Sequence, residues 1–200
     1  MTTFKKTARI FILSAPSRGG KDAVVRGLKE YHSLNLSHVI SYTTRKRRTN
    51  ERHGKVYHFI SREKFQEMVT SGVFIEWVTH NHEYYGIPKK SILSSMQRGH
   101  HVLLQVNLRG ARKVKKMWPQ ETVTIFLRPE KLLDLAKRFD PKNFTARQVR
   151  ERLAIARQEI ANATWCDHVI VNRDGKLTET VQEVARVIKK EIGITRLVPQ

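Results

Sequence analysis

The chain has 200 residues, a formal net charge of +20 and 40% hydrophobic residues. This length suits one α/β domain with its own core, and the hydrophobic fraction excludes an intrinsically disordered chain. No apolar run approaches the ~20 residues that a membrane-spanning helix needs, so no membrane partner is expected. The single cysteine, Cys166, excludes an internal disulfide and favours a reducing, cytoplasmic location.

The positive charge is distributed along the whole chain, from Lys5 to Arg196, and does not form one basic tail. Such a field attracts polyanions, including nucleotides, sugar phosphates and nucleic acid. Several basic residues lie in motifs that indicate phosphate binding. We therefore expect small phosphorylated substrates as partners, and no specific nucleic acid beyond nonspecific association at low salt.

Apolar and β-branched runs alternate with segments of helical periodicity. Strands are expected at residues 8–14, 36–43, 56–60, 73–78, 101–106, 123–127 and 168–171. Helices are expected at residues 21–31, 61–71, 89–98, 110–118, 129–139, 146–164 and 177–192, with Ser61 as a helix N-cap and 84–88 as a turn. This alternation predicts a parallel sheet with helices on both faces, and the tail after Gly193 is expected to fray.

A glycine-containing turn lies between the first strand and the first helix, reading A-P-S-R-G-G-K-D. In this context, the pattern G-x-x-x-x-G-K-[ST] is typical of a loop whose backbone N–H groups hold nucleotide phosphates. Lys21 would reach the β- and γ-phosphate oxygens, and the following helix adds its positive N-terminal dipole. The expected ATP-binding residues of this loop are Ala15, Pro16, Ser17, Arg18, Gly19, Gly20, Lys21 and Asp22.

Two positions of the loop depart from the pattern. Ala15 replaces the first glycine, which an alanine can do if its φ stays negative. Asp22 replaces the hydroxyl that normally ligates magnesium, and a carboxylate beside triphosphate oxygens is repulsive unless a cation bridges them. Either Asp22 holds Mg²⁺, directly or through water, or magnesium is handled differently here.

The segment from Ser41 to Phe59 reads S-Y-T-T-R-K-R-R-T-N-E-R-H-G-K-V-Y-H-F. It resembles the nucleotide-acceptor segment of guanylate kinases, whose pattern is roughly S-x-T-T-R-x-P-R-x-G-E-x-x-G-x-x-Y-x-F. The resemblance continues through F-I-E-W at 74–77, Y-Y-G at 84–86 and V-I-V-N at 169–172, and it covers nearly the whole chain. It implies an enzyme that phosphorylates GMP or dGMP to the diphosphate, with ATP and Mg²⁺.

The resemblance also implies which residues hold the acceptor. A monophosphate dianion needs fixed donors, which arginines and tyrosine hydroxyls supply. Arg45, Arg48, Tyr57 and Tyr85 fall at the phosphate-holding positions of the family. The guanine-contacting positions carry a serine and a glutamate, whose carboxylate suits the N1 and N2 hydrogens of guanine. The expected acceptor-binding residues are Ser41, Arg45, Arg48, Tyr57, Glu76, Tyr85 and Asn107.

The sequence departs from the family at three acceptor-side positions. Ile87 stands where guanylate kinases carry a serine or threonine after Y-G, so one guanine contact is lost. The family's D-x-D-x-x-G reads Q-V-N-L-R-G here, which makes amides of both acids at Gln105 and Asn107. We expect Asp22 to restore one negative charge on the opposite side of the metal. Asp22→Asn should then abolish turnover, whereas Asn107→Asp should be tolerated.

Two alternatives follow from these departures. Ribose 1,5-bisphosphate phosphokinases resemble the chain in a loop ending G-K-D, at Trp77 and Tyr84-Tyr85-Gly86, at Asn107 and at Asn172-x-Asp174-Gly175-x-Leu177. The near-complete segment from Ser41 to Phe59 argues instead for guanylate kinases. A guanylate-kinase-like module without turnover is the second alternative. The missing acids favour it, and the retained Gly20 and Lys21 oppose it.

Phosphoryl transfer requires positive charge around the moving group and a closing lid that excludes water. Besides Lys21, the resemblance places lid arginines at Arg138 and Arg152, and Lys142 stands where a further arginine is missing. Residues 140–145 are expected to form a mobile lid tip. Asn172 resembles a family position near the adenine of ATP.

We therefore expect a single domain of the α/β class, with a three-layer fold of the P-loop NTPase type around a central parallel sheet. Residues 7–40 and 99–193 would form its core, residues 41–90 a small acceptor-binding subdomain, and residues 136–158 a helical lid. The molecule is expected to be a monomer or a homodimer.

Overall fold

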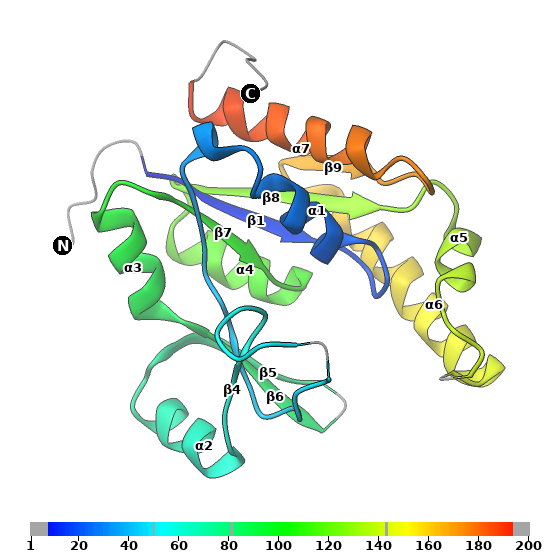
Figure 1. The fold of residues 1–200 in the computed structure, drawn as a ribbon, viewed down its shortest axis with the longest axis horizontal. Coiled ribbons are helices and arrows are strands. Elements are labelled where there is room, and N and C mark those ends of the chain that lie inside the picture. Colours follow the sequence, from blue (N-terminus) through cyan, green and yellow to red (C-terminus); the bar gives the residue numbers. More distant parts are fainter. Residues whose placement is uncertain (1–7, 50, 81, 143, 194–200) are drawn as a thin grey trace.

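A five-stranded parallel sheet forms the centre of the chain in the computed structural model, which describes residues 8–49, 51–80, 82–142 and 144–193 (Figure 1). Its strand order is β2-β7-β1-β8-β9, and each neighbouring pair is parallel. The strands are β1 (Ile10–Ser14), β2 (Leu36–His38), β7 (His101–Gln105), β8 (Thr122–Arg128) and β9 (His168–Val171). The order is that of a doubly wound sheet, whose ligands bind at the carboxyl ends of the strands.

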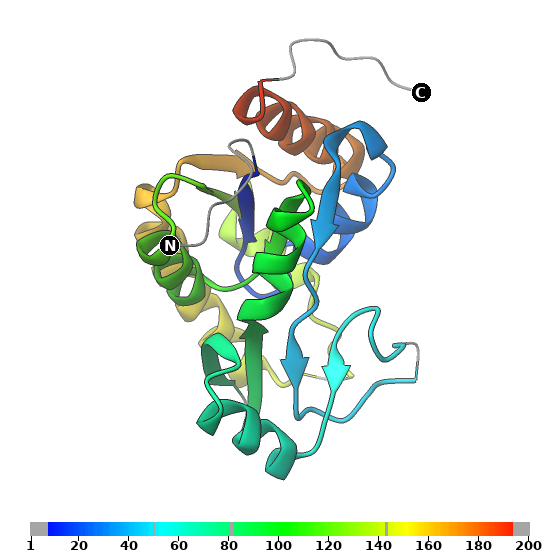
Figure 2. The same ribbon diagram turned by 90° about the vertical axis from the view of Figure 1, so that its left-hand side faces the viewer.

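Helices cover both faces of this sheet (Figures 1 and 2). Helices α1 (Lys21–Leu28) and α7 (Leu177–Glu191) pack together on one face and bury Phe11, Leu13 and their neighbours. Helices α3 (Lys89–Gln97) and α4 (Leu108–Met117) cover the other face around Ile10 and Ile12. The alternation of inward side chains along β1 thus supplies two separate cores, and the three-layer α/β fold is as predicted.

A second, four-stranded sheet, in the order β4-β3-β6-β5, begins where the chain leaves β2 and is separate from the central sheet (Figure 2). Its elements are β3 (Tyr42–Thr43), β4 (His58–Phe59), α2 (Arg62–Thr70), β5 (Phe74–His80) and β6 (Glu83–Pro88). Fully buried Phe65 of α2 stacks on Phe74 at 4.6 Å and on Tyr84 at 5.4 Å between ring centroids. The predicted cap of α2 is confirmed, because the Ser61 hydroxyl accepts from the backbone N–H of Lys64 at 3.1 Å.

The remaining helices are α5 (Leu132–Lys137) and α6 (Ala146–Ala161), with two 3₁₀ turns, η1 (His32–Leu34) and η2 (Asn162–Trp165). Helix α6 begins with a capping box, in which Thr145 and Gln148 satisfy each other's backbone N–H groups. Within the described ranges, no helix combines the length and the apolar character needed to cross a membrane. The expected fraying after Gly193 and part of the expected lid tip, residue 143, lie outside the described residues.

The prediction of one strand over residues 36–43 is wrong. Strand β2 ends at His38 in the central sheet, and β3 begins at Tyr42 in the small sheet. The backbone N–H of Val39 still donates to Leu103 of β7, while the carbonyl of Ser41 already accepts from His58 of β4. Residues with strand-forming side chains, Val39, Ile40 and Tyr42, lie on both sides of the change, so the sequence carries no mark of the crossing.

The prediction of a turn at residues 84–88 is also wrong, since these residues belong to β6, which pairs with β3 and β5. Gly86 allows a close approach here, because a Cβ on it would lie 2.7 Å from two ring atoms of Phe74. Pro88 is the last residue of the strand, where a missing N–H interrupts no central ladder. The glycine thus marks tight packing inside a sheet.

Candidate functional site

A cavity of about 390 Å³ opens at the carboxyl ends of β1 and β7. Its walls come from the glycine-containing loop, the small sheet, the residues after β7, and α6. The lining residues are Ala15, Ser17, Lys21, Ser41, Tyr57, Glu76, Val78, Tyr85, Gly86, Ile87, Gln105, Val106, Asn107, Gly110, Arg152, Ile155 and Glu159. Segments predicted to bind two different substrates therefore share one cavity.

The loop at Ala15–Asp22 wraps tightly before α1. Gly20 is the N-cap of α1 with φ of 87°, and Arg18 also has a positive φ of 63°. The backbone N–H of Gly19 donates to the Pro16 carbonyl at 2.8 Å, while Ala15 keeps a φ outside the positive range. Gly20, in the left-handed conformation, precedes Lys21 and leads the chain into α1. The backbone of the loop therefore lies at the N-terminus of α1 and its positive dipole.

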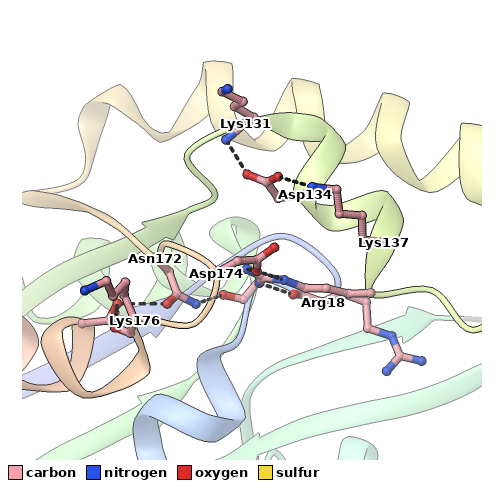
Figure 3. Close-up of polar contacts among 10 residues, drawn as sticks. Arg18, Lys131, Asp134, Lys137, Asn172, Asp174 and Lys176 are labelled. Carbon is pink, nitrogen blue, oxygen red and sulfur yellow. Dashed lines mark hydrogen bonds and ion pairs between the residues drawn. The ribbon is translucent and has the colours of Figure 1, made fainter.

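Asn172 is hydrogen-bonded to the loop (Figure 3). Its Nδ2 donates to the Gly19 carbonyl at 2.9 Å, and its Oδ1 accepts from the Thr180 hydroxyl of α7 at 2.9 Å. The side chain is only 5% exposed, and a Cβ on Gly20 would lie 2.4 Å from Nδ2. Both ends of the amide are thus engaged within the protein, and one of them ties Asn172 to the loop at Gly19.

Asn172→Ala is expected to lower the free energy of unfolding by about 1–3 kcal/mol, because it leaves buried partners unsatisfied. It should also raise the KM for ATP, since the loop loses its support at Gly19. Thr180→Val is the matched comparison: it removes the second bond and keeps the first, so stability should fall without a change in the ATP KM. Urea unfolding and initial rates measure both; an unchanged ATP KM in Asn172→Ala would contradict the positioning role.

Arg138 and Arg152, the two predicted lid arginines, approach the loop differently. Arg138 donates from Nη1 to the Arg18 carbonyl at 2.9 Å and forms an ion pair with Asp174 (Figure 3). Arg152 lines the cavity. The guanidinium groups of Arg152 and Arg18 lie over the same Phe144 ring, at 5.1 and 5.5 Å from its centroid. Both predicted arginines therefore stand within reach of the phosphate loop.

Five of the seven predicted acceptor residues line the cavity, namely Ser41, Tyr57, Glu76, Tyr85 and Asn107. Burial, with a smaller contribution from the Asp22 carboxylate, raises the pKa of Tyr57 to about 12. The hydroxyl therefore stays protonated at neutral pH and can donate to an anionic ligand.

Arg45 and Arg48 lie outside the cavity lining. The Arg45 guanidinium makes two contacts with the Glu51 carboxylate, at 2.8 and 3.0 Å, and lies 5.7 Å from the centroid of the Tyr57 ring. Arg48 is exposed, and its backbone N–H donates to the same carboxylate at 3.0 Å. Glu51 thus organises the segment that carries both arginines, and Arg45 is next to the cavity through Tyr57.

Glu76 places a carboxylate in the cavity without a hydrogen-bond donor among the described residues. Glu76 is 3% exposed, and neither Oε1 nor Oε2 has a hydrogen-bond partner among the described residues. Arg109 Nε and Lys113 Nζ each approach Oε1 only to 3.7 Å. Burial raises the pKa of Glu76, and these two cations oppose the rise. A ligand that offers two N–H groups would satisfy this carboxylate.

Asp22 is not one of the residues that line the cavity, but it is bound to one of them: Gln105 Nε2 donates to Asp22 Oδ1 at 2.9 Å. No hydrogen bond or ion pair engages Oδ2 among the described residues. The second amide, Asn107, uses its Oδ1 to cap α4 by accepting from the Gly110 N–H at 2.9 Å. The two amides that replace the acids therefore have different local tasks.

Three residues near the loop were not predicted from the sequence to belong to the site, namely Gln105, Glu159 and Asp174. Burial raises the pKa of Glu159 and the Lys21 ammonium opposes this, which places the carboxyl close to the loop lysine. Glu159 sits on α6 among charged residues of a long helix, and no local pattern distinguishes it. Gln105 did carry a signal, as an amide at an acidic position of the family.

Comparison with known proteins identifies relatives over nearly the whole chain. The family model described as Guanylate kinase matches residues 7–191. The guanylate kinase of Carboxydothermus hydrogenoformans is 34% identical over 91% of this chain and 88% of its own length, and that of Prochlorococcus marinus is 37% identical over 82% and 87%. A crystal structure of guanylate kinase from Anaplasma phagocytophilum superposes with a TM-score of 0.77 at 29% identity, covering 96% of this chain and 90% of that chain.

Proposed function

The chain belongs to the guanylate kinase family, and on this premise we propose that its cavity carries out ATP-dependent phosphorylation of GMP to the diphosphate. The observation that carries the assignment is the buried Glu76 carboxylate, which has no hydrogen-bond partner among the described residues and lines the same cavity as Lys21. One end of the cavity offers an acceptor for guanine N–H groups, and the other offers a cation for phosphates.

In the proposed reaction, the loop at residues 15–22 and the N-terminus of α1 hold the β- and γ-phosphates of ATP. Lys21 reaches the phosphoryl group in transit, and its ammonium stabilises the charge that spreads over the equatorial oxygens. A phosphate oxygen of GMP attacks the γ-phosphorus in line, the bond from that phosphorus to the bridging oxygen breaks, and ADP leaves. The reaction needs no covalent enzyme intermediate.

On the acceptor side, Tyr57 and Tyr85 donate hydrogen bonds from their hydroxyls to the GMP phosphate, and Arg45 and Arg48 complete its neutralisation. Arg45 is held by Glu51 beside the cavity-lining Tyr57, whereas the exposed Arg48 side chain has to turn toward the cavity to take this role. Ser41 and Glu76 recognise guanine. Ile87, buried where the family carries a hydroxyl, contributes shape only.

The chemistry of the donor set suits Mg²⁺ held mainly by substrate phosphates. Mg²⁺ usually binds through one or two carboxylates, phosphate oxygens and waters. Asp22 supplies one carboxylate with Oδ2 not engaged by described residues, and those residues form no cluster of three His, Cys, Asp or Glu that could hold a metal alone. When bound, the ion would neutralise part of the charge on the triphosphate, and Asp22 would hold it.

The proposal includes the predicted organisation of the chain. Residues 136–158 act as the lid, which brings Arg138 and Arg152 onto the transferring phosphoryl group. Arg138 must release Asp174 or rotate about that ion pair to do so. The acceptor-binding subdomain comprises residues 41–90. We further propose a cytoplasmic enzyme that works as a monomer or a homodimer.

An ADP-release assay with purified protein, ATP and Mg²⁺ tests the assignment. GMP and dGMP should support turnover, whereas AMP and ribose 1,5-bisphosphate should not. Turnover with ribose 1,5-bisphosphate alone would assign the other acceptor class. Turnover with none of the four, together with tight GMP binding by calorimetry, would identify a binding module.

Glu76→Gln is expected to raise the KM for GMP by about 10- to 100-fold, the loss of a charged hydrogen-bond pair. The pKa of Glu76 is raised in the folded chain, so protonation favours folding and the ionised carboxylate opposes it. The wild type should therefore gain stability relative to Glu76→Gln as pH falls from neutral into the carboxyl range. Thermal unfolding against pH measures this.

Glu67→Gln is the matched control, because Glu67 is an exposed residue of α2 paired with Lys64. It should leave the GMP KM unchanged. An unchanged GMP KM in Glu76→Gln would remove Glu76 from guanine recognition.

A further inference from the structure

A line of three polar side chains runs from the edge strand of the central sheet to the first turn of α1. His38 of β2 pairs with Leu103 of β7, and Gln105 lies two residues further along β7 on the same face. That face is the one covered by α1, on which Asp22 is the second residue. Sheet register therefore brings His38, Gln105 and Asp22 together, although 67 residues separate His38 from Gln105.

The two ends of the Gln105 amide have different partners. Nε2 donates to Asp22 Oδ1 at 2.9 Å. His38 lies beside Gln105 on this face; burial lowers the pKa of its imidazole, and the Gln105 side chain opposes this shift. An imidazole N–H next to the amide oxygen would keep the Gln105 NH₂ group directed at the carboxylate.

We propose that Gln105, oriented by His38, is a positioning residue for the metal–nucleotide complex: it fixes the Asp22 carboxylate through Oδ1 so that Oδ2 faces the metal bound to the ATP phosphates. The inference rests on the proposed function, in which Asp22 ligates that metal. It adds two residues that neither the loop pattern nor the acceptor segment assigns to the site.

The charge balance of the site explains why an amide suits this position. An acid at residue 105 would place a second anion about a hydrogen-bond length from Asp22, and a lysine there would cancel the charge that attracts the cation. A neutral donor orients the carboxylate and leaves its charge intact. Compared with the family pattern, the acid stands on α1 at Asp22, and the amide of Gln105 on β7 donates a hydrogen bond to it.

Calorimetric titration with ADP, once with excess Mg²⁺ and once with EDTA, separates the metal's contribution from that of the loop. The wild type should bind ADP more tightly with Mg²⁺. Gln105→Met keeps the volume and removes the donor, so this gain should shrink about 10-fold or more, as for other groups that orient metal ligands. Affinity in EDTA should stay unchanged, because the loop itself is untouched.

His38→Leu should reduce the same gain by a smaller factor, since the amide becomes free to turn. His38 lines a second cavity together with His32 and does not line the nucleotide cavity, so the substitution leaves the lining of the nucleotide cavity intact. His32→Leu is the matched control and should keep the full gain. Its unchanged behaviour separates the effect of the Gln105 bond from that of altering the second cavity.

Asp22→Asn distinguishes this inference from the proposal on which it rests. Loss of the Mg²⁺-dependent gain in both Asp22→Asn and Gln105→Met supports the positioning role. Loss in Asp22→Asn with a full gain in Gln105→Met overturns the role of Gln105 and keeps Asp22 as a ligand. A full gain in Asp22→Asn overturns both.

Discussion

Lys21→Met is expected to lower kcat by about 10³-fold or more while leaving the fold intact. Lys21 is the first residue of α1 and lines the cavity, so its ammonium is the fixed cation of the phosphate loop. Because phosphoryl transfer depends on positioning and positive charge, a neutral side chain of similar length removes a contribution that no neighbour replaces. Initial rates with saturating ATP and GMP measure the loss.

Lys29→Met provides the control for charge alone, since Lys29 follows the same helix as its C-cap and lines the other cavity. It should keep the wild-type kcat. Circular dichroism of both variants should match the wild type. A Lys21→Met enzyme with kcat near the wild-type value would contradict the assignment of this loop to the transferred phosphoryl group.

Asp22→Asn is the second substitution with a large expected effect and should abolish measurable turnover. The asparagine preserves size but removes the charge that holds the cation against the triphosphate. The bond from Gln105 to Oδ1 can persist, so the fold should be retained. Stability measured by urea unfolding therefore separates lost catalysis from lost structure.

Asn107→Asp is the companion variant, and it is expected to retain turnover. Asn107 caps α4 through its oxygen, a bond that an aspartate also makes, so the helix start should persist. The two variants make opposite exchanges between acid and amide, at two different positions. Turnover that survives in Asp22→Asn, or that disappears in Asn107→Asp, would contradict the account.

The strand, loop and helix that bind phosphate could be predicted from sequence because the signal is local. A buried apolar run, a glycine at the sixth position and a helical period follow one another within residues 8–31. The loop then needs only the conformation that Gly20 permits, which has φ of 87°. The alternation of strands and helices was equally local and gave the layered sheet.

The misassigned segments show what local patterns omit. Residues 36–43 mix apolar and polar side chains in both sheets they join, and only long-range pairing with β7 and then β4 divides them. Gly86 is a glycine because the Phe74 ring occupies the space of its side chain, a contact that no turn pattern encodes. Similarly, Gln105 and Asp22 are 83 positions apart, and only the register of β7 against β1 brings them together.

The site residues differ in the same way between local and long-range signals. Tyr57, Glu76 and Tyr85 belong to motifs within short stretches of the sequence, and they line the cavity as acceptor-side residues. Asn172 lies beside the phosphate loop, as a neighbour of that site should, but its amide is bound to Gly19 and Thr180. Sequence resemblance indicated the place of this residue, whereas its bond to Gly19 joins positions 153 residues apart, which no local pattern encodes.

A crystal structure with a non-hydrolysable ATP analogue and GMP tests the central claim most directly. The account predicts the analogue's terminal phosphates on the loop at Lys21 and the GMP guanine with its N1 and N2 hydrogens on Glu76. The GMP phosphate should then lie between Tyr57 and the loop. Guanine bound elsewhere, with Glu76 still without a partner, would contradict the account.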